Sequence, residues 1–267
     1  MLEKLLPMIS SMEWPTGPIA TAQGLQTYEV GLEKVFSCKG DPKELMAALR
    51  VFQTGDSLPY AYAGIAFTLV VASQEKDGSY VRKGLDIAME WLEKAQAKEP
   101  DIVAINVIEA LIYTYSGRFQ DARVVLDFLQ RQDPTNYYLH LAEIAYWYSQ
   151  KDLENTVHWI EQAAISATTV PQRLRLRARL GDIYLEFKKY DEALKVYEEA
   201  IHFSRQDPWL WHKASIVHWR RENFEEAERC NQRALKLRDF PEARKMESLL
   251  KKKKAGTGML GWLLGRQ

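Results

Sequence analysis

Histidines and paired carboxylates are the residues of this chain that could support acid–base or metal chemistry. None of its five histidines (His140, His158, His202, His212 and His218) stands in an HExxH or Cys/His metal-binding spacing. His212 and His218 are six residues apart, which places them on different faces of a helix. The pairs Glu198–Glu199 and Glu225–Glu226 fall on expected outer helix faces, where they are solvated. With no nucleophile elbow, phosphate-binding glycine loop or dinucleotide fingerprint, we expect a non-catalytic protein without cofactor or metal.

The composition narrows the class of protein further. Lys and Arg together number 36, as do Asp and Glu, and this balance argues against a dedicated nucleic-acid binder. The two cysteines, Cys38 and Cys230, are far apart and suggest neither a disulfide framework nor a metal cluster. No signal-peptide core is evident, and the longest largely apolar run, Gly64–Ala72, is too short to cross a bilayer. We therefore expect a soluble, cytoplasmic protein.

Small and turn-forming residues recur at one interval along the chain. The pairs that are 34 residues apart are Ala88 and Ala122, Pro100 and Pro134, Gly181 and Ser215, Ala193 and Ala227, and Ala200 and Ala234. A fixed period of about 20 to 50 residues is the signature of stacked structural repeats. Such arrays present extended binding surfaces, so the period also bears on function.

The clearest repeat runs from residue 179 to residue 201. Apolar residues at three- and four-residue spacing mark one helix face before the Lys188–Lys189 link and a second face after it. Gly181 and Ala193 are small at the points where two helices must approach closely. The segment from Trp209 to Leu237 repeats this helix–turn–helix pattern.

These residues resemble the tetratricopeptide repeat (TPR) family, whose pattern combines an aromatic, a Leu-Gly pair and a Tyr with a later Ala–aromatic–Ala set. The matching positions are Leu180, Gly181, Tyr184, Ala193, Tyr197 and Ala200, then Trp211, Ala227, Ala234 and Pro241, and more loosely Ala110, Tyr113, Phe119, Ala122 and Pro134. The resemblance implies an all-α, right-handed solenoid of about six helical hairpins with a C-terminal capping helix. The interval from Thr156 to Ala193 is 37 residues, which predicts an insertion near 166–173 that lengthens a second helix or its following loop.

The same pattern sets the expected boundaries. Residues 1–20 are expected to be an N-terminal segment that is partly loop, residues 21–254 the repeat array, and residues 255–267 a flexible Gly-rich tail with an apolar Trp cluster. Early helices are expected at 22–37, 42–53 and 59–74, with a turn at Asp77–Ser79. Asp41 followed by Pro42 is a strong helix start. The capping helix is expected to span 241–254.

In TPR arrays the first helix of each pair lines the concave face, so the resemblance implies a peptide-binding groove. The residues expected to line it are Tyr115, Tyr138, Tyr148, Arg175, Arg179, Trp209, His212, Lys213, Trp219 and Arg220. Aromatics give large contact area and Arg gives forked donors, which suits an acidic-aromatic peptide or an amphipathic helix. The alternative is that the aromatics fill seams between repeats and the arginines pair with acids such as Glu154 and Glu161.

A subclass of TPR modules clamps a C-terminal carboxylate with polar and basic residues on consecutive first helices. The corresponding positions here include Leu141, Ala145 and Ala178, which are apolar. This departure argues against binding of chaperone tails.

The C-terminal tail combines a lysine run with an apolar cluster. The residues expected to dock are Lys251, Lys252, Lys253, Lys254, Trp262, Leu263 and Leu264. Lysines beside Trp and Leu are typical of an interfacial membrane anchor, here strong enough only for weak, reversible adsorption to an anionic surface. A docking peptide for another protein, an intramolecular plug for the groove and an inert end are the competing interpretations.

Taken together, these patterns predict a scaffold or adaptor that binds a peptide or helix of a protein partner in a concave groove. The alternative is a peripheral membrane adaptor localised by its tail, and a minor alternative is a nucleic-acid-associated regulator. Self-association through exposed aromatics of a terminal repeat is a further expectation.

Overall fold

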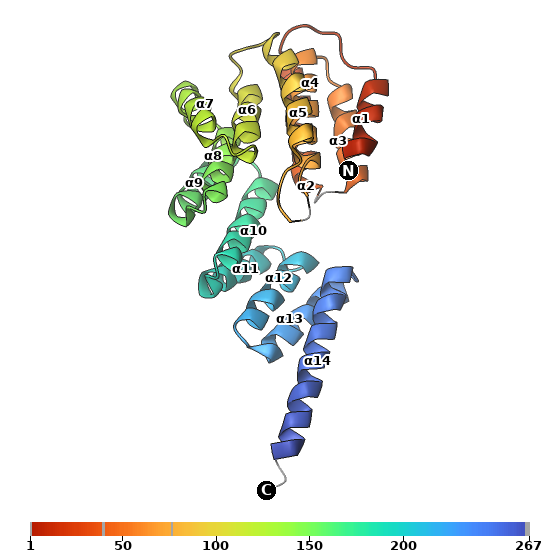
Figure 1. The fold of residues 1–267 in the computed structure, drawn as a ribbon, viewed down its shortest axis with the longest axis vertical. Coiled ribbons are helices and arrows are strands. Elements are labelled where there is room, and N and C mark those ends of the chain that lie inside the picture. Colours follow the sequence, from red (N-terminus) through yellow and green to blue (C-terminus); the bar gives the residue numbers. More distant parts are fainter. Residues whose placement is uncertain (1, 39–40, 76, 265–267) are drawn as a thin grey trace. The chain divides into compact units, whose positions relative to one another are not determined.

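The computed structural model describes residues 2–38, 41–75 and 77–264, and the side chains of all of these except 37 and 255–264. The described residues form fourteen α-helices joined by short connections (Figure 1). They are α1 (Leu2–Ser11), α2 (Ala22–Ser37), α3 (Pro42–Gln53), α4 (Leu58–Ala72), α5 (Arg82–Gln96), α6 (Val103–Tyr115), α7 (Phe119–Gln132), α8 (Tyr137–Ser149), α9 (Leu153–Ser166), α10 (Val170–Glu186), α11 (Tyr190–Phe203), α12 (Pro208–Arg220), α13 (Phe224–Leu237) and α14 (Pro241–Leu264).

The helices divide into two compact units with a boundary between Ser166 and Ala167. The N-terminal unit holds α1 to α9 and the C-terminal unit holds α10 to α14. Six antiparallel pairs follow one another: α2 with α3, α4 with α5, α6 with α7, α8 with α9, α10 with α11, and α12 with α13. Within each unit the first helices of successive pairs also touch, as α2 does α4, α4 does α6, α6 does α8 and α10 does α12. This packing confirms the predicted all-α solenoid of helical hairpins.

The backbone repeats with the period read from the sequence. Gly117, Lys151, Lys188 and Glu222 all have positive φ angles, and each follows the first helix of a pair. Their intervals are 34, 37 and 34 residues, so three extra residues do lie between the fourth and fifth pairs. The prediction that they lengthen a second helix or its following loop is wrong, however. The first helix α10 has four more residues than α6, α8 and α12 (17 against 13), and the connection before it, 167–169, is one residue shorter than those before α8 and α12. Thr169 and Gln172 form a capping box that starts α10 early.

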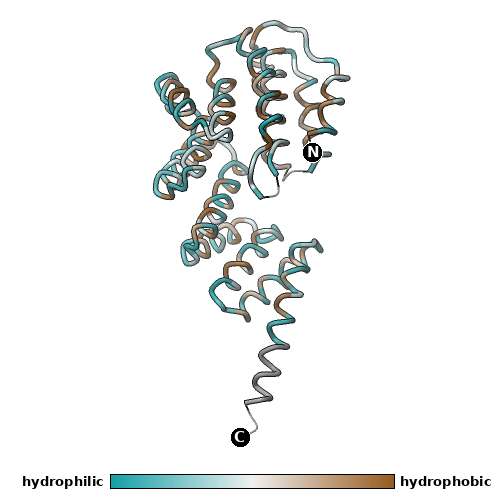
Figure 2. The backbone as a smooth tube through the Cα atoms, viewed as in Figure 1, coloured by the Kyte–Doolittle hydropathy of each residue, from teal (hydrophilic) through white to brown (hydrophobic). Residues whose placement is uncertain are grey.

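Helix α4 is the centre of the N-terminal unit. Its sequence has no charged residue, and it is apolar on every face, whereas polar and apolar residues alternate along most other helices (Figure 2). A helix of this composition must be buried, and α4 packs against α2, α3, α5 and α6. The Phe52 ring lies against Gly64 of α4 and Gly31 of α2, where an added Cβ would fall 2.5 Å and 2.1 Å from ring carbons. Glycine at these two positions allows the close packing.

The core of the C-terminal unit is divided into smaller clusters. One joins α11 to α12 around Tyr197, another joins α13 to α14 through Met246 and Leu250, and a third surrounds Phe240. Helix α14 packs on α13 as the predicted capping helix does, but it continues to Leu264 rather than ending near Lys254. Extending a formed helix needs no new nucleation, so its last turns can follow from the packed ones.

Candidate protein-binding groove

The N-terminal unit contains a cavity of about 180 Å³ that we call the aromatic hollow. Its lining residues are Tyr28, Leu32, Phe36, Phe67, Val70, Val71, Tyr80, Val107, Ile108, Leu111, Tyr115, Tyr138 and Leu141. Apart from Tyr80, they come from α2, α4, α6 and α8, which are the first helices of four successive pairs. Among the described residues, this lining contains no charged side chain.

Helical spacing places these side chains on one wall. Tyr28, Leu32 and Phe36 are four residues apart on α2, and the same spacing relates Val107, Leu111 and Tyr115 on α6. Residues at such spacing share a helix face. These α2 and α4 residues were not among the groove residues expected from the sequence, because the repeat pattern is faint there. The four-residue stripes were the signal that could have found them.

Tyr28 anchors the floor of the hollow. It is only 1% exposed, its ring stacks on Tyr60 at 5.3 Å, and its hydroxyl donates a 3.0 Å hydrogen bond to the Ala104 carbonyl. Burial raises the pKa of Tyr28 well above its ordinary value, and Tyr138 raises it further. The neutral, hydrogen-bonded Tyr28 ring therefore ties α2 to α6 beneath the cavity.

Tyr80 reaches the hollow from the connection between α4 and α5. The predicted turn is present: Asp77 accepts from the Ser79 backbone and hydroxyl, and Gly78 has a φ of 88°. An isolated antiparallel β-bridge between Gln74 and Tyr80 closes this small loop. The Tyr80 ring then stacks on Tyr115, with centroids 4.0 Å apart and planes at 10°. The connection between α4 and α5 thus adds one aromatic ring to a lining that otherwise comes from helices.

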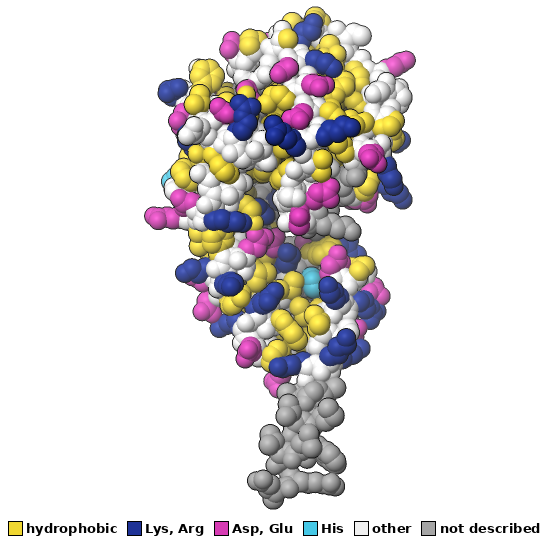
Figure 3. Space-filling model, in the orientation of Figure 1, with side chains coloured by type: hydrophobic (Ala, Val, Ile, Leu, Met, Phe, Trp, Pro, Cys, Tyr) yellow, Lys and Arg dark blue, Asp and Glu magenta, His cyan; other side chains and the backbone are white. Residues whose placement is uncertain are grey.

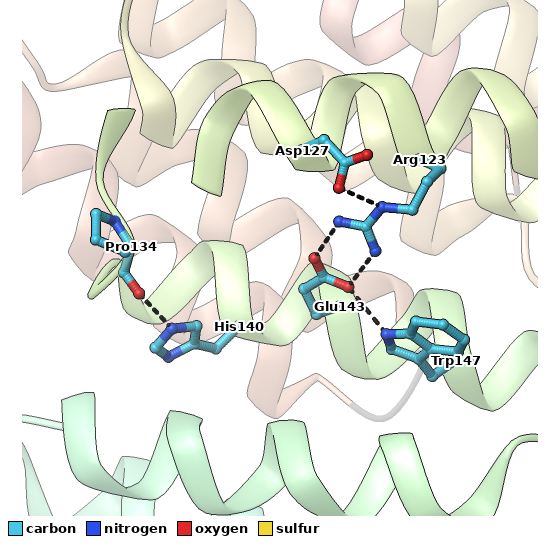
Figure 4. A network of polar contacts seen from close by, with 6 residues as sticks. All are labelled: Arg123, Asp127, Pro134, His140, Glu143 and Trp147. Atoms are coloured by element: carbon cyan, nitrogen blue, oxygen red, sulfur yellow. Dashed lines mark hydrogen bonds and ion pairs between the residues drawn. The ribbon is translucent and has the colours of Figure 1, made fainter. Parts of the chain in front are cut away.

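A buried ion pair fixes α8 beside the hollow (Figure 4). Arg123 of α7 donates to both carboxylate oxygens of Glu143 at 2.7 and 2.9 Å, and the Glu143 side chain is fully buried. Trp147 donates to the same carboxylate at 3.1 Å, and Asp127 accepts from Arg123 at 2.8 Å. Because these groups satisfy one another, the pair can be tolerated inside the protein. It locks α7 to the helix that carries Tyr138.

His140 provides a second anchor for α8. One ring nitrogen lies 2.9 Å from the Pro134 carbonyl (Figure 4) and the other 2.9 Å from the Ser166 hydroxyl. This histidine is buried and has a packing role.

Two of the three expected groove tyrosines in this unit line the hollow. Tyr115 and Tyr138 do so from α6 and α8, at the places implied by the TPR resemblance. Tyr148 lies near the other end of α8, where the Lys151 ammonium is 4.9 Å from its ring centroid. The structure therefore brings Tyr115 and Tyr138 together with residues of α2 and α4, but leaves Tyr148 outside that lining.

In the C-terminal unit, one of the expected basic groove residues pairs with an acid of the same unit. Lys213 makes a 2.7 Å ion pair with Asp182, and the Tyr197 hydroxyl donates to Asp182 at 2.6 Å. Burial, with Asp182 as the second cause, raises the pKa of Tyr197. These contacts join α10, α11 and α12. Arg175 and Arg179 lie half-buried on α10, and Arg220 is exposed at the end of α12.

The expected groove aromatics of the C-terminal unit pack on the next elements. Trp209 lies 4.5 Å from Phe240 between ring centroids, and Trp219 packs with Phe224, Met246 and Leu250. His212 was expected to line the groove, but its side chain is only 4% exposed. It lies between Phe240 and Asn231. The reason is that Phe240 and α14 close over this part of α12, so these rings fill seams between helices.

The four tail lysines are exposed on α14. Lys251 pairs with Glu247 at 3.0 Å, Lys254 pairs with Glu228, and the Lys253 ammonium is 5.0 Å from the Phe224 ring centroid. Lys252 is exposed. The side chains of Trp262, Leu263 and Leu264 lie outside the described residues. In the part of the chain that is described, no helix is long and apolar enough to cross a membrane, and no cluster of His, Cys, Asp and Glu suits a metal.

Six successive helical pairs, four of whose first helices enclose an apolar hollow, define a helical-repeat fold. Residues 174–207 match the sequence profile of the tetratricopeptide repeat, so this segment of the chain has the sequence character of a TPR. The matched segment covers most of α10 and all of α11, where the consensus residues are densest. No curated protein sequence matches the chain.

Solved structures share this fold at low sequence identity. PilF of Pseudomonas aeruginosa is 15% identical, with a TM-score of 0.55, 79% of this chain covered and 93% of PilF covered. A tetratricopeptide repeat protein from Parabacteroides merdae is 16% identical, with a TM-score of 0.52 and coverage of 86% and 88%. A chain of the APC/C assembly Cut9–Hcn1 is 12% identical, with a TM-score of 0.55. The alignment covers 85% of this chain and 43% of that chain. These likenesses concern the fold alone.

Proposed function

We propose that the chain is a non-catalytic protein-interaction scaffold and that its N-terminal unit binds an apolar segment of a partner in the aromatic hollow. The observation that carries this proposal is the composition of the hollow. Four consecutive first helices turn aliphatic and aromatic side chains toward one cavity, which is the face that helical-repeat arrays use for binding.

The size of the hollow favours one anchor side chain. A dry apolar cavity of about 150 Å³ accommodates benzene, and the hollow measures about 180 Å³. A single aromatic ring or a branched aliphatic side chain therefore fits. Burying such a side chain contributes about 1.5 to 3 kcal/mol, which is typical of an anchor residue at a protein interface.

Tyr115 and Tyr138 supply the polar edge of this proposed site. Both are only partly buried, so their rings can form one wall for an apolar anchor while other residues of the partner extend over the surface. Tyr side chains suit this role because they combine an apolar body with a hydrogen-bonding tip. We propose Arg175, Arg179 and Arg220 as basic contacts presented by the C-terminal unit on its own.

The alternative of a membrane adaptor is less well supported than the scaffold. Two of the four tail lysines already pair with Glu247 and Glu228, which lowers the positive charge offered to an anionic surface. Sedimentation of the protein with anionic vesicles tests this alternative directly. We expect the protein to stay in the supernatant, and salt-sensitive pelleting would favour the adaptor.

Photo-crosslinking tests the scaffold proposal. A photoreactive phenylalanine analogue replaces Tyr138 in the hollow or, as a control, Phe128, which is 43% exposed on the outer face of α7. We expect adducts with a defined protein from position 138 that position 128 does not give and that Leu111→Trp abolishes by filling the cavity. Equal labelling from both positions, or labelling unaffected by Leu111→Trp, would refute the proposed site.

A further inference from the structure

We infer that the occupant of the aromatic hollow is the C-terminal segment of a second copy of this chain. This inference rests on the proposed function, because it names the partner of the proposed site. It is carried by the distribution of charge over the two units, the composition of the helices around the hollow, and the length of α14.

The neutral chain is made of two oppositely charged units. Residues 1–166 contain 14 Lys and Arg against 22 Asp and Glu, a formal charge of −8. Residues 167–267 contain 22 Lys and Arg against 14 Asp and Glu, a formal charge of +8. Lys and Arg side chains are spread over the visible face of the C-terminal unit (Figure 3). Opposite charge of this size on two units of one chain favours contact between unlike units of two copies.

The charge imbalance extends to the hollow itself. The four helices that line it carry Glu29, Glu33, Glu109 and Glu143, and Lys34 as their single Lys or Arg. Arg123 neutralises Glu143, and Glu109 accepts from Gln96 at 2.8 Å. Glu29 and Glu33 lie one turn apart on α2, each next to a residue that lines the cavity. By composition the four helices thus carry more acidic than basic residues, which suits an apolar segment flanked by cations.

The C-terminal segment has this composition. Residues 251–254 are four consecutive lysines, of which Lys251 and Lys254 pair with acids of their own unit, and residues 259–264 include Met, Trp and three Leu. A Trp ring is about the size that the hollow accepts, and an apolar helix in a groove is a common way in which proteins recognise one another. The lysines precede the apolar residues by about one to three helical turns, so cations and anchor can reach neighbouring parts of one acidic surface.

The length of α14 suits a contact with a second copy. Leu250 is the last buried residue among the described side chains of α14, and the helix continues for 14 residues to Leu264. At about 1.5 Å per residue this extension is about 21 Å long. This stretch continues the packed part of α14 and is long enough to carry the apolar segment to a second copy. The contact would be heterologous and, unless the copies close into a ring, would produce open chains.

Sedimentation of the full-length protein over a range of concentrations tests this inference. We expect mass to increase with concentration and the association to weaken as salt is added, because separated charges are screened. Trp262→Ala should weaken self-association by about 30-fold, the loss expected for an interface anchor. Phe203→Ala is the matched control, since this aromatic is 66% exposed on α11 and belongs to neither surface. It should leave the association unchanged.

Variants of the hollow test the other half of the contact. Leu111→Trp fills the cavity, and Glu29→Lys with Glu33→Lys reverses the local charge without entering the core. We expect each to weaken self-association at least about tenfold with helicity retained. A chain that stays monomeric at all concentrations, or one whose association Trp262→Ala and Leu111→Trp both leave intact, would overturn the inference.

Indole binding separates this inference from the proposed function. Indole mimics a Trp side chain, and we expect it to bind the Trp262→Ala protein in a manner that Leu111→Trp abolishes. If indole binds so but the wild-type chain remains monomeric, the second copy is the wrong occupant and the proposed site stands. If indole does not bind, the hollow is not a binding site and both proposals fail.

Discussion

Both units of this protein are built from helical pairs, but the first helices of these pairs pack differently in the two units. The C-terminal unit keeps the repeat consensus and matches the TPR profile over residues 174–207, and its first-helix aromatics pack into seams. In the N-terminal unit the consensus is faint, yet four first helices enclose the aromatic hollow. The difference teaches that consensus residues record how repeats stack, whereas the cavity is formed where the sequence departs from them.

The same packing device appears in both units with different outcomes. In the C-terminal unit, Gly181 lets the Tyr197 ring approach α10, and an added Cβ would lie 2.6 Å from it. In the N-terminal unit, Gly64 and Gly31 do this for Phe52, which draws α3 against both α2 and α4. One ring thus joins two pairs there, and a single continuous core results. We expect the two units to respond differently to mutation.

The largest expected effect is on this shared ring. Phe52→Ala should cost the N-terminal unit about 3 to 5 kcal/mol, because it removes buried surface and leaves a cavity between α2, α3 and α4. Chemical denaturation monitored by hydrogen exchange will show which unit opens. Phe203→Ala in the C-terminal unit should have almost no effect, since that ring is exposed. Equal loss from the two changes would contradict the assignment of a continuous core to the N-terminal unit.

The next largest effect on stability concerns the ion pair between Arg123 of α7 and Glu143 of α8. Glu143→Ala leaves Arg123 and Trp147 without their buried acceptor and should cost about 3 kcal/mol. Its counterpart, Lys213→Ala in the C-terminal unit, removes a half-exposed partner of Asp182 and should cost well under about 1 kcal/mol. Urea titrations of both variants give the comparison. A Glu143→Ala protein as stable as wild type would show that the network does not hold α8 in place.

A smaller effect should separate the units by pH. Burial lowers the pKa of His212 and His218, both in the C-terminal unit, below the ordinary value of 6.5. These histidines favour the folded state above that value, and their contribution is lost as pH falls, because the unfolded chain then binds protons more strongly. Between about pH 7.5 and about pH 5.5, amide protection factors, which compare each exchange rate with the intrinsic rate at the same pH, should fall more in the C-terminal unit than in the N-terminal unit. Substituting both histidines with glutamine should remove the difference, and an equal loss of protection in both units of the wild type would refute it.

The smallest effect concerns the turns after the first helices. Gly117 and Lys151 occupy equivalent positions with φ angles of 75° and 63°. Gly117→Ala should destabilise the protein by about 1 kcal/mol, whereas Lys151→Gly should change stability by less than that and in the favourable direction. Thermal unfolding of the two single variants measures the difference. A stabilising Gly117→Ala would show that the turn does not need a left-handed residue.

Much of the fold could be predicted from the sequence, because the spacing of apolar and turn residues is kept even in repeats that have lost most TPR consensus residues. The 34-residue interval and the extra three residues reappear in the backbone at Lys151, Lys188 and Glu222. The early helices at 22–37 and 42–53 have the expected bounds, and Asp41 caps the second of them by accepting from the Lys43 amide. Helix caps and apolar spacing are local signals, so they can be read from one sequence.

The site was predicted only in part. Tyr115 and Tyr138 were expected in the groove, but Tyr28 and Tyr80 were not, because contacts between successive pairs and the small loop at 73–81 are properties of the folded chain. His212 and Trp209 looked like groove residues until Phe240 and α14 were seen to pack against them. The net charge of the whole chain is zero, so it did not indicate that the two units carry formal charges of opposite sign.

Hydrogen exchange of the protein with its photo-crosslinked partner tests the central claim most directly, namely that the aromatic hollow of the N-terminal unit is the binding site. We predict that the partner slows exchange along α6 and in the first turns of α8, and that Leu111→Trp removes this protection. The amides of α12, which carry Trp209 and Trp219, should exchange at unchanged rates. Protection confined to α10 and α12, with none on α6 and α8, would contradict the account and return the binding site to the unit with the stronger repeat consensus.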